Sequence, residues 1–204
     1  MNPQDLPTIN HPIPMKTLII VDYQYDFYHP QGGLHVAGGE TLEDKIAAIM
    51  PQYDHIIFTL DWHPTTHCSF VSNGGPWPEH CVQYSCGAGI STVLLKAAAG
   101  SGATVTFYQK GFRPEEEEYG AFAELLHPEQ QRHTDGQEPR ALFAASHEIA
   151  VCGLAGGFCV NQTIENLIHA GYHDRIVLLR DCTGLICTPA EFQQFLADNH
   201  VAVR

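Results

Sequence analysis

Short, largely apolar runs recur along the chain, and several of them end at a charged side chain. The first run, 17–21, is continuously apolar after its first residue and rich in β-branched side chains. That composition is typical of a parallel strand buried on both faces of its sheet. We expect a strand in each of these runs: 17–21, 55–60, 103–108, 148–152, 175–179 and 201–203.

Apolar residues at helical spacing lie between these strands. They predict helices over 41–50, 160–170 and 189–199, and a helical region over 119–146 in two pieces separated by a polar turn at 133–136. Strands that alternate with helices predict a parallel sheet covered on both faces, an α/β fold of three layers.

The length of 204 residues suits one domain, so we expect residues 1–204 to fold as a single unit. Residues 1–15 are rich in proline and are expected to form a surface arm. Residues 62–90 form a long irregular stretch rich in His, Cys, Gly and Pro, and loops of this length are usually functional. The glutamate run 115–118 is expected to be a solvated surface.

The charge balance narrows the range of partners. The net charge is −13, from 23 acidic and 10 basic residues, whereas nucleic acids and anionic membranes bind basic surfaces. Neither is therefore an expected partner. The seven cysteines include no C-x-x-C pair, the N-terminus lacks a secretory pattern, and no apolar run reaches the ~20 residues of a membrane span. We expect a cytoplasmic protein with free thiols.

Four chemically capable side chains lie at the predicted carboxyl ends of four different strands. They are Asp22, Asp61, Lys110 and Cys159. Ligands of parallel α/β sheets bind beyond the carboxyl ends of the strands. The sequence therefore predicts a functional site at this edge of the sheet.

Cys159 lies where a strand has turned and a helix begins, within the segment 153–163. Unpaired N–H groups and the helix dipole at such a place favour a thiolate, so we expect a lowered pKa and a nucleophile. The alternative is a buried, inert cysteine. Asp22 and Lys110 could supply the base and the positive charge that a reactive thiol needs, although a structural ion pair or a histidine base is also compatible with the sequence.

The segment Asp61-Trp62-His63 offers a carboxylate and an imidazole on one side of an extended chain. Such donors suit zinc, iron or manganese. His67 and His80 follow and could complete a site with open positions for water or substrate. The alternative is a group of loop histidines without a metal.

Five segments together resemble a known family. They are 21–27, 61–63, 77–81, 108–111 and 153–163, and they occur in the order found in nicotinamidases (pyrazinamidases) of the isochorismatase-like cysteine hydrolase superfamily. The resemblance spans about residues 16–190. It implies a Rossmann-like, isochorismatase-like fold with a six-stranded, mainly parallel sheet.

The resemblance also implies roles for individual residues. The catalytic triad would be Asp22, Lys110 and Cys159. One divalent metal ion, with zinc expected and iron or manganese as alternatives, would be bound at a site whose ligands are Asp61, His63 and His80, with His67 as a candidate extra ligand.

The same resemblance implies a substrate pocket. Phe27 and Trp77 would sandwich a pyridine ring, and Leu154 would line the site through a cis peptide bond to Ala155. The backbone N–H groups of Ala155 and Cys159 would form an oxyanion hole. The segments 83–88 and 115–122 depart from the usual family pattern and could reshape the entrance of the site.

The implied reaction is hydrolysis of nicotinamide to nicotinate and ammonia, and of pyrazinamide to pyrazinoate, through a thioester in NAD salvage. The expected partner is thus a small-molecule substrate, and association into a homo-oligomer is compatible with the sequence. The first alternative is an amidase of the same superfamily that acts on carbamoyl or ureido compounds. Such amidases generally lack the metal motifs. Isochorismatase chemistry would not need the Cys159 thiol, and a non-catalytic binding module would not need the triad.

Overall fold

The computed structural model describes residues 15–126, 134–135 and 139–204. Within these residues a seven-stranded sheet has the order β4-β3-β2-β1-β5-β6-β7, and every neighbouring pair is parallel except β3 and β4. The strands are β1 Met15–Val21, β2 His55–Asp61, β3 Thr104–Lys110, β4 Thr134–Asp135, β5 Ser146–Gly156, β6 Ile176–Leu185 and β7 Ala202–Val203. The predicted six-stranded, mainly parallel sheet is confirmed, with the two-residue β4 added at its edge.

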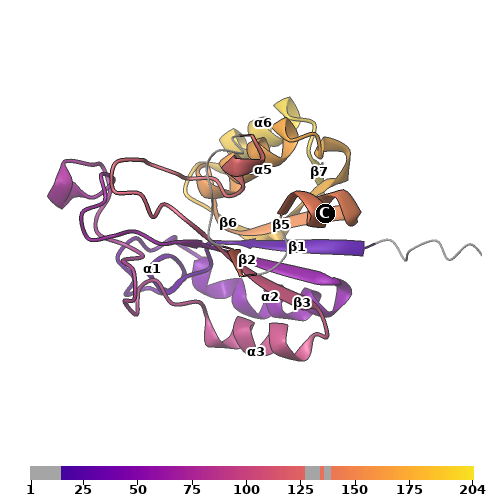
Figure 1. Ribbon diagram of the computed structural model, residues 1–204, viewed down its shortest axis with the longest axis horizontal. Coiled ribbons are helices and arrows are strands. Elements are labelled where there is room, and N and C mark those ends of the chain that lie inside the picture. The colour runs from indigo at the N-terminus through magenta and orange to yellow at the C-terminus, as the bar shows by residue number, and fades with distance from the viewer. Residues whose placement is uncertain (1–14, 127–133, 136–138) are drawn as a thin grey trace, which may run out of the picture.

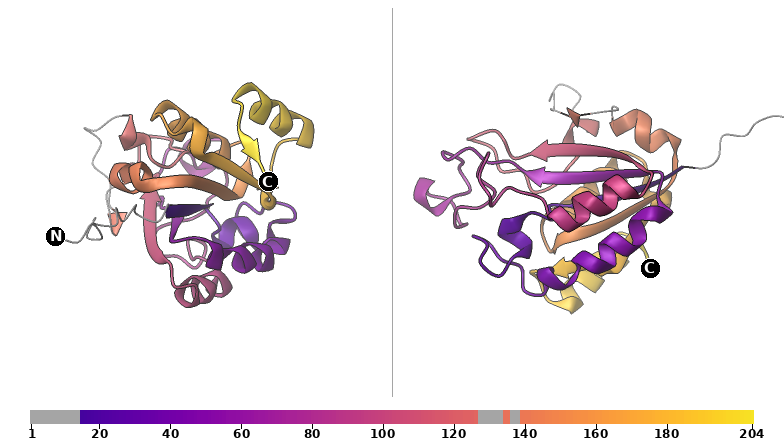
Figure 2. Two further views of the ribbon diagram at one scale, coloured as in Figure 1. Left: turned by 90° about the vertical axis from the view of Figure 1, so that its right-hand side faces the viewer. Right: turned by 90° about the horizontal axis from the view of Figure 1, so that it is seen from below.

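Helices cover both faces of this sheet (Figures 1 and 2). Helices α2 (Glu43–Ile49) and α3 (Thr92–Gly100) lie on one face. Helices α4 (Pro139–Ala145), α5 (Cys159–His169) and α6 (Pro189–Asp198) lie on the other. No helix among the described residues is long and apolar enough to cross a membrane.

The alternation of side chains along β1 explains the two cores. Leu18 and Ile20 belong to the core beneath α2 and α3, whereas Ile19 and Val21 belong to the core beneath α5 and α6. All four are fully buried. The strand is therefore buried on both faces, as its continuous apolar run predicted.

The structure corrects the interpretation of two segments. The prediction of a first helical piece in 119–146 is wrong over the described residues 119–126, which contain only a 3-10 turn at Ala123–Leu125. The polar break contains β4, and the second piece is α4. Sequence analysis missed α3, although Ser91 caps it by accepting hydrogen bonds from the N–H groups of Val93 and Leu94. Residues 1–14 of the predicted arm lie outside the described residues.

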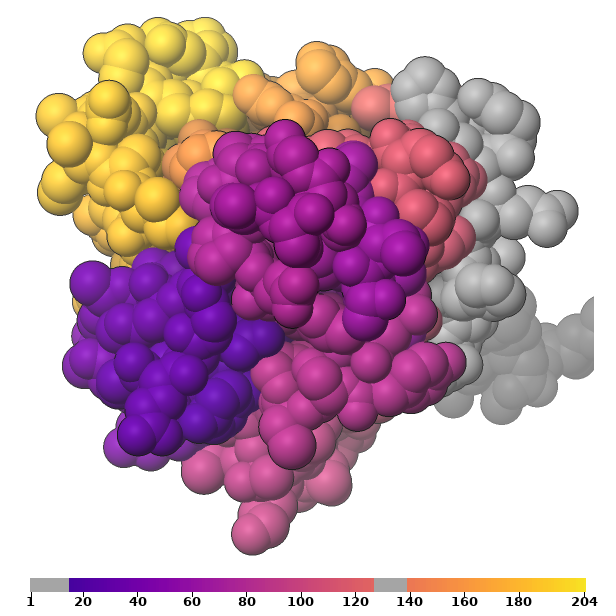
Figure 3. Space-filling view, turned by 90° about the vertical axis from the view of Figure 1, so that its left-hand side faces the viewer, coloured from indigo at the N-terminus to yellow at the C-terminus, as the bar shows by residue number. Residues whose placement is uncertain are grey.

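The loops after the strands gather over the carboxyl edge of the sheet. Figure 3 shows this face, where the indigo segment that follows β1 meets the purple-to-magenta segment that follows β2. Isolated bridges tie the loops together, between Gln24 and Ile90 and between His63 and Val82. The irregular stretch 62–90 therefore folds against the edge at which the candidate catalytic residues were predicted.

Candidate active site

The strand order brings the four predicted side chains to one place. Asp61 and Lys110 are paired residues at the ends of β2 and β3, Asp22 follows β1, and Cys159 opens α5 just after β5. All four are buried, with Asp22 and Lys110 completely inaccessible. Adjacent parallel strands in the order β3-β2-β1-β5 thus produce the cluster that the sequence predicted.

Lys110 is the centre of this cluster. Its Nζ lies 2.8 Å from Asp22 Oδ2, is also paired with Asp61 Oδ1, and lies 3.8 Å from Cys159 Sγ. Burial opposes the charged form, but the attraction of Asp22 and Asp61 outweighs it and raises the pKa of Lys110 well above its usual value. Lys110 is therefore a permanent positive charge beside the thiol.

Asp22 is held in a constrained backbone conformation. Its φ is +43°, its N–H donates to Thr59 Oγ1 at 3.1 Å, and Thr59 Oγ1 donates to Asp22 Oδ1 at 2.6 Å. Burial raises the pKa of Asp22, with Lys110 opposing. One carboxylate oxygen of Asp22 lies within 4.8 Å of Cys159 Sγ. A carboxylate of raised basicity next to a thiol can accept its proton.

The expected lowering of the Cys159 pKa is wrong. Cys159 does open α5, but burial raises the pKa of its thiol well above the usual value, and Lys110 only partly opposes this because Asp22 and Asp61 add negative charge. The thiol is therefore protonated at rest. Its activation requires a base in contact with it, the position that Asp22 occupies.

Asp61, His63 and His80 converge as a candidate metal site. One ligand atom from each lies within 4.8 Å of the others. His63 Nδ1 donates to Gly111 O at 2.7 Å and His80 Nδ1 donates to Pro78 O at 2.8 Å, which leaves both Nε2 lone pairs facing Asp61 Oδ2 at 3.5 and 3.9 Å. Backbone carbonyls that orient the second ring nitrogen are typical of metal-binding histidines.

The local charges fit a cation. Two buried carboxylates, Asp22 and Asp61, share the buried ammonium of Lys110. Although burial opposes ionisation of Asp61, the attraction of Lys110 holds its pKa well below the usual range. A divalent ion would offset the remaining negative charge, and one oxygen with two nitrogen donors leaves positions open for other ligands.

His67 lies against the candidate metal site but is not among its converging ligand atoms. Its ring is 4.0 Å from that of His63, while Nδ1 contacts Ser69 Oγ at 2.7 Å and Nε2 contacts the carbonyl of Glu116 at 3.1 Å. Burial and the neighbouring His63 lower the pKa of His67 to about 4. In this arrangement both ring nitrogens are engaged within the protein.

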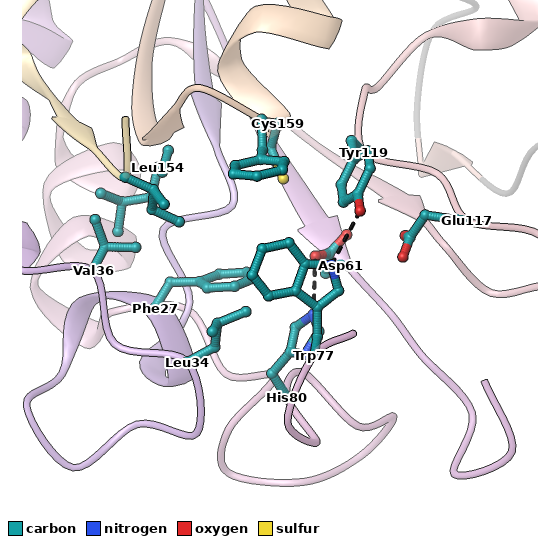
Figure 4. Close-up of a pocket in the computed structure, with 13 residues that line it drawn as sticks. Phe27, Leu34, Val36, Asp61, Trp77, His80, Glu117, Tyr119, Leu154 and Cys159 are labelled. Carbon is teal, nitrogen blue, oxygen red and sulfur yellow. Dashed lines mark hydrogen bonds and ion pairs between the residues drawn. The ribbon is translucent and has the colours of Figure 1, made fainter. Parts of the chain in front are cut away.

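A pocket of about 420 Å³, its open mouth included, leads to Cys159 (Figure 4). Phe27, Trp77 and Leu154 all line it, and the Leu154–Ala155 bond is cis, as the resemblance implied. Other residues of the wall were not predicted from the sequence: Leu34, Val36, Glu117, Tyr119, Phe158 and Ile186.

Two of the missed residues hold Trp77 in place. Trp77 Nε1 donates to Tyr119 Oη at 3.1 Å, and the Phe158 ring meets the Trp77 ring edge-on at 5.2 Å. Phe158 could have been suspected from its position beside Cys159. Tyr119 follows the run 115–118, which was expected to be a solvated surface. Glu117, a member of that run, is exposed to solvent and also lines the pocket.

Comparison with known proteins decides the family. No family model matches the chain. The nicotinamidase/pyrazinamidase of Mycobacterium tuberculosis is 32% identical over 174 residues, which cover 80% of this chain and 84% of that protein. The chain belongs to the nicotinamidase family. Its resemblance to nicotinamidases is thereby confirmed.

Solved structures of nicotinamidase relatives agree. The crystal structure of PnC1 from L. infantum in complex with nicotinate has a TM-score of 0.76 and 33% identity, covering 93% of this chain and 92% of that one. The pyrazinamidase of Pyrococcus horikoshii in complex with zinc has a TM-score of 0.72 and 28% identity, covering 94% and 99%.

The substitution Gly111→Ala should reduce the metal content of this nicotinamidase-family protein. Gly111 has φ +66°, and a Cβ there would lie 2.4 Å from His63 Cε1, so the ring must move. The measurement is zinc per protein after loading and gel filtration. Gly102→Ala is the matched control, because it has φ +82° with nothing within 4 Å of an added Cβ. Equal zinc contents in the two folded variants would contradict His63 as a ligand.

Proposed function

We propose that this protein hydrolyses nicotinamide to nicotinate and ammonia, and pyrazinamide to pyrazinoate, as a metal-assisted cysteine hydrolase. The observation that carries the proposal is the contact of Lys110 with Asp22, Asp61 and Cys159 at the base of an aromatic pocket. Membership of the nicotinamidase family supports the substrate.

The pocket binds the pyridine ring between Phe27 and Trp77. Both side chains line the pocket, and Tyr119 and Phe158 fix the Trp77 ring by a hydrogen bond and an edge contact. A divalent ion held by Asp61, His63 and His80 would supply a Lewis acid for the ring nitrogen. Binding the ring in this way orients the carboxamide toward Cys159, which lies in the same pocket.

Asp22 moves the proton in the first half of the reaction. It takes the proton of the Cys159 thiol as the sulfur attacks the carboxamide carbon, and the backbone N–H groups of Ala155 and Cys159 stabilise the oxyanion. Asp22 then gives the proton to the departing ammonia, and a thioester remains on Cys159. The positive charge of Lys110 stabilises the negative charge that moves between Asp22 and the sulfur.

In the second half, Asp22 takes a proton from water as the water oxygen attacks the thioester carbon. The carbon–sulfur bond breaks, Asp22 returns the proton to the sulfur, and the product leaves as nicotinate after the carboxylic acid loses its remaining proton to solvent. We further propose zinc as the ion, supported by the zinc complex of the P. horikoshii relative, with iron or manganese as alternatives. A role in cytoplasmic NAD salvage fits the reaction, and all seven cysteines are free.

The alternative substrate class, carbamoyl or ureido compounds, is not favoured. The curated nicotinamidases that match this chain share 27–32% identity with it over most of its length. The convergence of Asp61, His63 and His80 also weighs against a reaction without a metal.

Purified protein should release ammonia from nicotinamide, and exhaustive chelation should abolish the release. Adding zinc, iron or manganese back should restore it, because the ion would orient the substrate and offset the buried negative charge. Ammonia is measured with a coupled assay. Metal-replete protein that releases ammonia from carbamoyl substrates but not from nicotinamide would rule out the proposed substrate and leave the cysteine chemistry in place.

The substitution Cys159→Ala should lower turnover at least about a thousandfold, since the covalent step is lost. Its zinc content should equal that of the parent protein, because Cys159 is not among the proposed metal ligands. Cys86→Ala, at an exposed position, is the control and should keep full turnover. Substantial turnover in Cys159→Ala would refute the nucleophile assignment.

A further inference from the structure

One member of the glutamate run lies in the wall of the pocket, where the reaction described above gives it no role. Glu117 lines the pocket together with Tyr119 and Cys159. Figure 4 shows it on the side of Tyr119 and Asp61, away from the apolar side that contains Leu154. A carboxylate that lines the pocket adds its negative charge to the surroundings of any molecule bound there.

Glu117 differs from the other carboxylates of the site in its ion pairing. Asp22 and Asp61 are both paired with Lys110, and the neighbouring Glu116 is paired with Arg113. Within the described part of the chain, no basic side chain forms an ion pair with Glu117. Glu117 is exposed to solvent although it lines the pocket. Its partial burial and the negative charge of Asp61 raise its pKa, while His63 and Lys110 oppose this rise.

A hydrogen bond to the following residue restrains the carboxylate of Glu117. The N–H of Glu118 donates to Glu117 Oε1 at 3.0 Å. Glu118 is itself tied to the end of β3, since its Oε2 accepts from the N–H of Gly111 at 3.0 Å. These contacts restrain the exposed carboxylate of Glu117 beside the pocket.

We propose that Glu117 sets the selectivity of the pocket for a neutral pyridine carboxamide over the anionic pyridine carboxylate. The inference rests on the proposed hydrolysis, in which the substrate is uncharged and the product carries a full negative charge. Repulsion by Glu117 acts on the product and hardly on the substrate. Glu117 thereby weakens product binding and limits product inhibition.

The test compares the binding of the two ligands in a protein that cannot turn over. In the zinc-loaded Cys159→Ala variant, calorimetric titration gives the dissociation constants of nicotinamide and nicotinate. The same titrations are made after adding Glu117→Gln or, as the matched control, Glu115→Gln. Glu115 belongs to the same run and carries the same charge, but it does not line the pocket.

We expect Glu117→Gln to tighten nicotinate binding by about three- to tenfold relative to nicotinamide, a modest factor because the carboxylate is partly screened by water. Glu115→Gln should leave the ratio unchanged. An unchanged ratio in Glu117→Gln, or an equal shift in both variants, would overturn the inference. A parent variant that binds neither ligand would overturn the substrate assignment as well, whereas binding without a Glu117 effect overturns the selectivity role alone.

Discussion

The buried ammonium of Lys110, placed between Asp22 and Asp61, is the interaction on which the site depends. Isolated charges at this depth would be strongly destabilising, so each of the three groups requires the others. Because Asp61 also faces His63 and His80, the same ammonium connects the proposed catalytic residues with the proposed metal site. A change in the charge of the proposed catalytic residues would therefore alter the electrostatics of the proposed metal site, and the reverse also holds.

The sheet makes this arrangement possible. The pairing of Asp61 with Lys110 across β2 and β3 sets their side chains next to each other, and β1 and β5 bring Asp22 and Cys159 beside them. Gln24 fixes the end of β2, since its side chain accepts from the N–H of Asp61 and donates to the carbonyl of Asp61, both at 2.8 Å. Rigid strand ends rather than loops therefore hold most of the chemistry.

Sequence patterns predicted the part of the site that strands position. Apolar runs end at Asp22, Asp61 and Lys110, and a residue at the end of a parallel strand can be assigned to an edge without knowing the loops. Tyr119 and Phe158 come from loops whose paths depend on tertiary contacts. Glu117 is exposed like Glu115, and nothing in the sequence distinguishes it as a pocket residue. The predicted direction of the Cys159 pKa shift was wrong because the effect of a helix end can be read from the sequence, whereas the depth of burial cannot.

The central claim is that Cys159, protonated at rest and activated by Asp22, carries the acyl group during the reaction. The most direct test is mass spectrometry of metal-replete protein mixed with nicotinamide and quenched in acid within one turnover. The account predicts a nicotinoyl adduct on the peptide that contains Cys159, absent in Cys159→Ala. An adduct on another residue would contradict the account. So would turnover without any adduct when the quench times are short enough to separate acylation from hydrolysis.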